Sequence, residues 1–89
     1  MKEFTLDLAG TYSADDFYEY LGEYISIPSY FGYNLDALWD LLTDVREETV
    51  IHIVNAEEAK FTLPKFIRGL ERIASRLDKE DANVRIVFD

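Results

Sequence analysis

Two aspartates spaced four residues apart are the first residues in this chain whose arrangement indicates chemistry. Asp36 and Asp40 lie within an apolar stretch, and Asp44 continues the same spacing. Residues four apart in a helix share one face, where like charges destabilise the helix by about 0.2–0.5 kcal/mol. Asp40 and Asp44 would also approach the negative end of the helix dipole. The spacing therefore favours a carboxylate surface that binds cations or basic side chains, with an ordinary solvated helix face as the alternative.

The segment before these aspartates is rich in aromatic residues. Tyr30, Phe31 and Tyr33 surround Gly32, which we expect to permit a turn with positive φ. Tyrosine and tryptophan are enriched at the energetic centres of protein interfaces. These rings could therefore stack on a ligand or anchor a partner. The alternative is that two of them cover the edge of the core, which we expect of Phe31 at least.

Other catalytic chemistry is poorly represented. The chain has no cysteine and one histidine, His52, and it lacks a glycine-rich phosphate loop, a Cys/His metal pattern and a nucleophile elbow. Asp36, Asp40 and His52 could in principle hold a divalent metal. Two carboxylates on one helix and a distant histidine form a poor site, however. We therefore expect no enzyme activity, no metal and no cofactor, and a packing or surface role for His52.

Negative charge is concentrated in the first half of the chain. Residues 1–48 contain eleven acidic and two basic residues, whereas residues 49–89 contain seven of each, so the whole net charge of −9 lies in the first half. Such a surface repels nucleic acid and anionic membranes and attracts basic proteins or cations. Simple solubility is the alternative explanation for this acidity.

The elements that must position these residues follow from hydrophobic periodicity. Residues 2–8 alternate as a strand does, residues 49–55 have the β-branched pattern of a buried strand, and residues 84–88 form another strand. Asn34 is a good N-cap for a short helix that runs to about Thr43. Pro64 suits the first turn of a longer helix, and residues 55–61 can form a helical turn. A helix from Ser13 would bury a stripe of five residues, Phe17, Tyr20, Leu21, Tyr24 and Ile25.

The order β-α-α-β-α-β predicts an α/β fold. Strands joined by helical crossovers are parallel, so we expect a small three-stranded parallel sheet with three to four packed helices. The length of 89 residues favours a single domain, residues 1–89. No targeting segment is visible, and no apolar run approaches the ~18 residues that span a bilayer. We expect a cytoplasmic protein that is monomeric when free.

One row of positive charge stands apart from this pattern. Arg68, Arg72 and Arg76 recur every four residues on the helix after Pro64, opposite its apolar stripe. Such a row could bind an anion or receive the acidic half of a neighbouring chain. A solvated helix face is the alternative.

Residues 28–43, PSYFGYNLDALWDLLT, resemble the signature of the barstar family. Members of that family are intracellular protein inhibitors of barnase-like microbial ribonucleases, and they are not enzymes. The resemblance implies a barstar-like fold and a 1:1 complex in which the acidic helix and its preceding loop enter the nuclease active site. It makes Asp40 the main anchor, in the place of a substrate phosphate, with Asp36 beside a neighbouring base and Tyr30 against the catalytic histidine region. The rest of the implied contact surface is Asn34, Leu35, Trp39, Thr43 and Asp44.

Three positions depart from the family pattern. Asp44 and Val45 stand where the best-known member has Gly-Trp, and Arg76 stands where that member has an acidic residue that contacts the enzyme. An arginine that faces a basic nuclease would be repulsive unless the partner differs. The alternatives are therefore an acidic interaction or immunity module that neutralises a different basic toxin and, less favoured, a small metal-dependent hydrolase.

Overall fold

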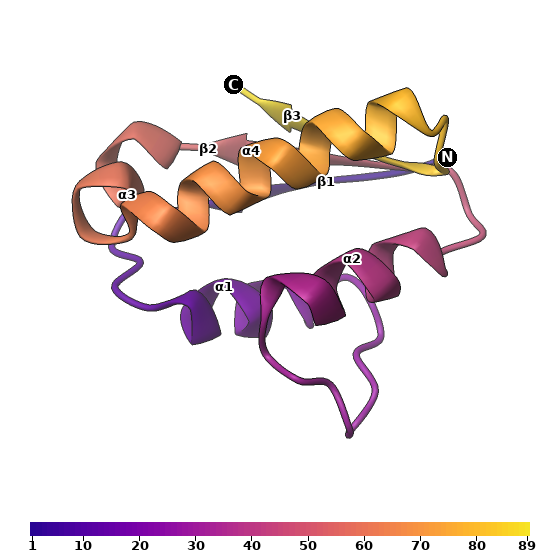
Figure 1. Ribbon diagram of the computed structural model, residues 1–89, viewed down its shortest axis with the longest axis horizontal. Helices are drawn as coiled ribbons and strands as arrows, with labels where there is room; N and C mark the ends of the chain where they lie inside the picture. The colour runs from indigo at the N-terminus through magenta and orange to yellow at the C-terminus, as the bar shows by residue number, and fades with distance from the viewer.

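The computed structural model of the protein describes all residues from Met1 to Asp89. Three strands and four helices follow one another along the chain (Figure 1). The α/β prediction is confirmed, with a fourth helix where a helical turn was expected. The elements are β1 (Lys2–Asp7), α1 (Ala14–Leu21), α2 (Leu35–Thr43), β2 (Thr49–Val54), α3 (Ala56–Thr62), α4 (Pro64–Lys79) and β3 (Val84–Phe88).

The sheet has the strand order β1-β2-β3, and both pairs of strands are parallel. Phe4, Ile51 and Ile86 lie side by side across it. Right-handed crossovers in this strand order place every connecting helix on the same face. Burial follows this rule, because Phe4 and Leu6 are buried while the alternating residues of β1 are exposed. One face of the sheet is thus covered by helices and the other is open to solvent.

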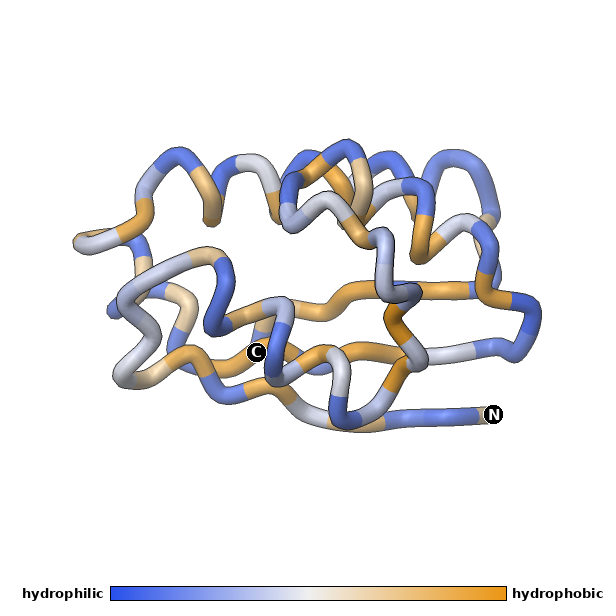
Figure 2. Tube along the Cα trace, turned by 90° about the horizontal axis from the view of Figure 1, so that it is seen from below, coloured by the Kyte–Doolittle hydropathy of each residue, from blue (hydrophilic) through white to orange (hydrophobic).

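The core lies between the sheet and the helix layer. Figure 2 shows the strands as extended segments beside the coiled helices, whose hydrophobic positions turn toward the strands. The long helix α4 contributes most to this contact, since Ile67, Leu70, Ile73 and Leu77 are buried at helical spacing. None of the four helices has both the length and the apolar character that a membrane crossing requires.

Helix α1 differs from the sequence prediction. It ends at Leu21, so the helical spacing that linked Phe17 to Ile25 does not continue, and Tyr20 and Tyr24 are each 39% exposed. Tyr24 instead stacks on Phe4, with 4.4 Å between the ring centroids. The predicted buried stripe was therefore wrong at these two tyrosines, although Phe17, Leu21 and Ile25 are buried as expected. Tyr18, which lay outside the stripe, is buried as well.

Candidate functional site

The start of α2 is fixed by Asn34, as the sequence predicts. Its backbone is extended, and its side-chain Oδ1 accepts a hydrogen bond from the Ala37 N–H at 2.7 Å. The Nδ2 group of the same side chain donates to the Gly32 carbonyl at 3.1 Å. The first hydrogen bond satisfies the Ala37 N–H, which has no partner within the helix. The second ties the preceding loop to the helix, so Asn34 sets the position of one against the other.

The loop before α2 turns at a different residue from the one predicted. Gly32 does not have a positive φ; the left-handed residue is Tyr33, with φ 51°. A non-glycine residue in this conformation costs roughly 1–2 kcal/mol. The Tyr33 ring packs against Phe31 and Tyr18, with centroid separations of 5.4 and 5.7 Å, and these contacts offset the strain. Glycine at position 32 is instead favoured by the lack of room, because a Cβ atom there would lie 3.0 Å from Asn34 Nδ2.

Phe31 anchors the loop on the body of the protein, and Tyr30 does not. Phe31 packs edge-on against the buried Tyr18, with 5.2 Å between centroids, which confirms that Phe31 covers the core edge. Tyr30 points the other way, and it is 87% exposed. A 3.0 Å hydrogen bond from the Phe31 N–H to the Pro28 carbonyl closes the turn that contains Tyr30. Anchoring Phe31 therefore presents Tyr30 to solvent at a defined place.

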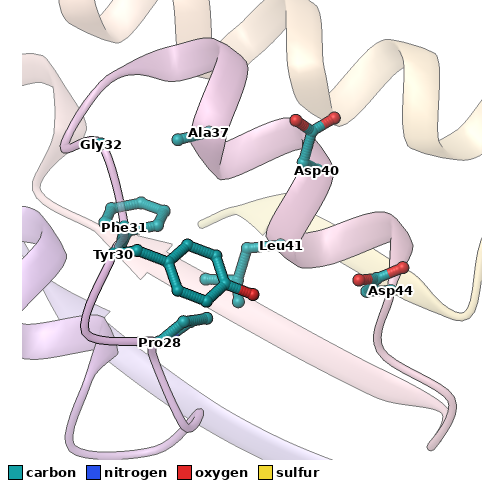
Figure 3. Close-up of a pocket in the computed structure, with 8 residues that line it drawn as sticks. All are labelled: Pro28, Tyr30, Phe31, Gly32, Ala37, Asp40, Leu41 and Asp44. Carbon is teal, nitrogen blue, oxygen red and sulfur yellow. The ribbon is translucent and has the colours of Figure 1, made fainter.

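A hollow of about 270 Å³ lies between this loop and α2. Figure 3 shows Ala37 and Leu41 pointing from α2 toward the loop, the Tyr30 ring lying across the space, and Asp40 and Asp44 projecting from successive turns of the helix. We call it the Tyr30 hollow. The residues that line it are Pro28, Tyr30, Phe31, Gly32, Ala37, Asp40, Leu41 and Asp44.

The carboxylates of α2 are available to a partner. Asp36, Asp40 and Asp44 are exposed, and none of their carboxylates forms an ion pair within the chain. Around the last turn, the Thr43 hydroxyl donates to the Trp39 carbonyl at 2.8 Å. The Asp44 N–H donates to the Asp40 carbonyl at 3.2 Å. The helix end is thus closed by its own bonds, and its negative charge is left without a counter-charge from the chain.

Asp36 takes part in a second hollow, between α2 and α4. The residues that line this groove are Leu35, Asp36, Trp39, Gly69, Arg72, Ile73 and Arg76. Leu35 packs directly over Gly69, and the Arg76 guanidinium lies over the Trp39 ring at 3.9 Å from its centroid. The predicted site residues therefore all lie on or beside α2, but Asp36 and Asp40 line different hollows.

His52 lies elsewhere, on the open face of the sheet. Its Nε2 is 2.5 Å from Glu3 Oε2, and its Nδ1 is 2.9 Å from Asp89 Oδ2. The hydrogen bonds to Glu3 and then to Asp89 raise the pKa of His52. The suggested metal site of Asp36, Asp40 and His52 is not assembled, because His52 uses both ring nitrogens on other carboxylates. No group of three or more His, Cys, Asp or Glu side chains is arranged so that it could hold a metal ion.

Sequence reasoning missed part of the Tyr30 hollow. Ala37 and Leu41 both line the hollow. They lie four residues apart, Ala37 directly after Asp36 and Leu41 directly after Asp40. Their spacing alone could have indicated an apolar wall beside the carboxylates. Tyr18 was also missed as the support of the loop, because three of the rings that pack against it, Phe31, Tyr33 and Phe66, lie far along the chain.

Comparison with known proteins identifies the family of this chain. No curated protein matches the chain. The family model described as Barstar (barnase inhibitor) matches residues 1–89, and that family is one of inhibitors. Because the match spans the whole chain, the protein belongs to the barstar family.

Proposed function

We propose that this protein is a non-catalytic, 1:1 inhibitor of a basic, barnase-like ribonuclease. In this proposal the chain acts as a single domain, residues 1–89, that is monomeric when free, and α2 and its preceding loop fill the nuclease active site. The observation that carries the proposal is a pair of exposed carboxylates, Asp40 on α2 and Asp44 at its C-cap, which form no ion pair within the chain and line the Tyr30 hollow.

Free carboxylates on a fixed helix suit the task of replacing RNA phosphates. A ribonuclease holds phosphate with cationic side chains, and carboxylates form short, charge-assisted hydrogen bonds with the same groups. Asp40 breaks no internal ion pair when it binds. Helix α2 is also anchored by the Asn34 cap and by Leu35 over Gly69, so little conformational entropy is lost. Asp40 is therefore the proposed anchor, with Asp36 and Asp44 on either side.

The exposed ring of Tyr30 completes the proposed contact. A partner side chain that enters the Tyr30 hollow meets an apolar wall of Ala37 and Leu41 and the face of the Tyr30 ring. A flat, cationic side chain such as a protonated histidine would gain both stacking and charge attraction there. Asn34, Leu35, Trp39 and Thr43 form the proposed remainder of the surface.

Long-range attraction supports the same proposal. The whole net charge of −9 lies in residues 1–48, which include the loop and α2. Such a surface steers a basic enzyme into contact, and the association rate falls as salt screens the attraction. We therefore expect fast association at low salt and a marked decrease in rate at higher salt.

The test is inhibition of barnase, the enzyme named in the family description, by wild-type protein and by two variants. Asp40→Ala should weaken binding by more than about 3 kcal/mol, because the cations of the nuclease then lose their buried counter-charge. Glu19→Ala is the control, since Glu19 is an exposed acid of the same half of the chain on α1. It should change binding by less than about 0.5 kcal/mol. A loss below about 1 kcal/mol for Asp40→Ala would contradict the assigned anchor.

A second candidate is neutralisation of a basic toxin that is not a ribonuclease. The observation that favours it is Arg76, a cation on α4 beside the proposed surface. Both candidates use the same carboxylates and differ in the enzyme that is blocked. The second candidate is favoured if the wild-type chain captures a basic protein that has no ribonuclease activity and Asp40→Ala does not capture it.

A further inference from the structure

The groove between α2 and α4 has a charge opposite to that of the acidic helix beside it. We call it the α2–α4 groove, defined by Leu35, Asp36, Trp39, Gly69, Arg72 and Arg76; its volume is about 260 Å³. One acidic and two basic side chains line it. The groove thus has one positive charge in excess, although α2 itself has only acidic charges.

The groove is a built feature and not a chance gap between side chains. Leu35, in the first turn of α2, packs onto α4 where Gly69 has no side chain, and a Cβ atom at Gly69 would overlap Leu35. The Trp39 ring, one turn further along α2, is covered on one face by the Arg76 guanidinium at 3.9 Å from the ring centroid. The two helices are therefore held at a fixed separation, with both arginines at the rim.

The positive charge is not neutralised within the chain. Arg72 is exposed and forms no ion pair. The only ion pair of Arg76 is with Glu80, at 3.8 Å between two side chains that are each more than half exposed, and such pairs are weak. Asp36 lines the same groove but balances only one of the two arginines.

A partner whose contact reaches Asp36 also reaches this groove, because Asp36 lines it. Trp39 lines the groove together with Asp36, and the Arg76 guanidinium rests on the Trp39 ring. A guanidinium that loses water without gaining a counter-charge is strongly unfavourable. A partner that is uniformly basic would pay this cost as well as direct repulsion.

We propose that the natural partner places a carboxylate in the α2–α4 groove, where it pairs with Arg72 and Arg76. This inference rests on the proposed function. It describes the partner as a nuclease whose cationic active site is flanked by an acidic side chain, and it makes Arg72 and Arg76 specificity-determining residues. Asp40 then supplies affinity for the cationic centre of the nuclease. The two arginines select among basic nucleases by the charge of the side chains around that centre.

The probe is barnase, together with variants in which single exposed positions around its active site are replaced by Asp or by Lys. Inhibition constants are measured for the wild-type inhibitor and for Arg72→Glu, Arg76→Glu and Arg68→Glu. Arg68→Glu is the matched control, since it makes the same charge change on the same row of α4 but does not line the groove. Asp40→Ala is measured in parallel, and sedimentation reports the oligomeric state of each free protein.

We expect one cluster of positions around the nuclease active site at which the Asp variant of barnase binds the wild-type inhibitor at least tenfold more tightly than the Lys variant does. At that cluster Arg76→Glu should reverse the preference and Arg72→Glu should reduce it, while Arg68→Glu leaves it unchanged. In this reversal Arg76→Glu binds the Lys variants of barnase more tightly than wild type does. An inhibitor variant that failed to fold could not give this gain. Equal preferences, within threefold, for wild type and Arg76→Glu at every position would overturn the inference. A wild-type dimer that Arg76→Glu dissociates would also overturn it, and would assign the groove to a second copy.

These outcomes separate the inference from the proposed function. Inhibition that depends on Asp40 but not on Arg72 or Arg76 refutes the inference and leaves the proposed function intact. Absence of inhibition toward barnase and all its variants refutes the proposed function, and the inference fails with it.

Discussion

The phenol of Tyr18 gives a prediction whose size follows from its surroundings. Its side chain is 1% exposed, its hydroxyl has no hydrogen-bond partner within the chain, and the rings of Phe17, Phe31, Tyr33 and Phe66 pack edge-on against it. Burial, with a smaller contribution from the charge of Asp15, raises the pKa of Tyr18 to about 12 from 10.0. The folded protein therefore keeps this proton to a higher pH than the unfolded chain does. Its free energy of unfolding must fall as pH rises from 10 to 12.

The magnitude follows from the two pKa values. A difference of one pH unit between folded and unfolded pKa corresponds to about 1.4 kcal/mol, so roughly 2–3 kcal/mol of stability is lost across this window. Tyr18→Phe removes the titrating hydroxyl and keeps the ring contacts. Because an unpaired buried hydroxyl costs about 1–3 kcal/mol, we expect the variant to be at least as stable as wild type at pH 8. Its advantage should grow by roughly 2 kcal/mol at pH 12.

The assay is urea unfolding at pH 8, 10 and 12, followed by the fluorescence of Trp39, the only tryptophan. Tyr12→Phe is the control, because Tyr12 is 75% exposed and its removal should leave the pH profile of wild type unchanged. Parallel pH profiles for wild type and Tyr18→Phe would refute the reasoning about burial. A loss of more than about 1 kcal/mol at pH 8 for Tyr18→Phe would show that the hydroxyl stabilises the fold instead.

Three further predictions concern the surface and the helix cap. Tyr30→Ala should weaken barnase binding at least tenfold while the melting temperature stays within about 2 °C of wild type, because the ring is exposed; inhibition and thermal unfolding together check this. His52 has a raised pKa from its bonds to Glu3 and Asp89, so its stabilisation is fully present below pH ~6.5 and is lost as pH rises through the folded pKa. His52→Gln should remove that decline, and urea unfolding from pH 5 to 9 tests it. Asn34→Ala should cost about 1 kcal/mol of stability through the lost N-cap, measured by urea unfolding against wild type.

The elements with regular spacing could be predicted from the sequence. The buried residues of α4, such as Ile67 and Leu70, follow a 3.6-residue period, and the strands follow a period of two because each has one covered face. The α2 boundaries were also predictable, since Asn34 is a local capping signal. The exposed carboxylates Asp36 and Asp40 follow from the same periodicity.

Features that depend on contacts between distant segments could not be predicted. Tyr18 is buried, while Tyr20 on the same helix is exposed, because rings from the loop before α2 and from α4 pack against Tyr18. The positive φ falls on Tyr33 and not on Gly32 for the same reason, since packing of its ring offsets the strain. The α2–α4 groove and the contact of Arg76 with Trp39 likewise require the relative placement of two helices.

Competition between the inhibitor and a mononucleotide for barnase is the most direct test of the claim that α2 takes the place of RNA phosphate. The dissociation constant of the wild-type complex is measured at increasing concentrations of the mononucleotide, with the nuclease held constant. Mutually exclusive binding predicts an apparent dissociation constant that rises linearly with mononucleotide concentration. A dissociation constant that stays unchanged when the nucleotide site is saturated would show that both bind together, and would contradict the account.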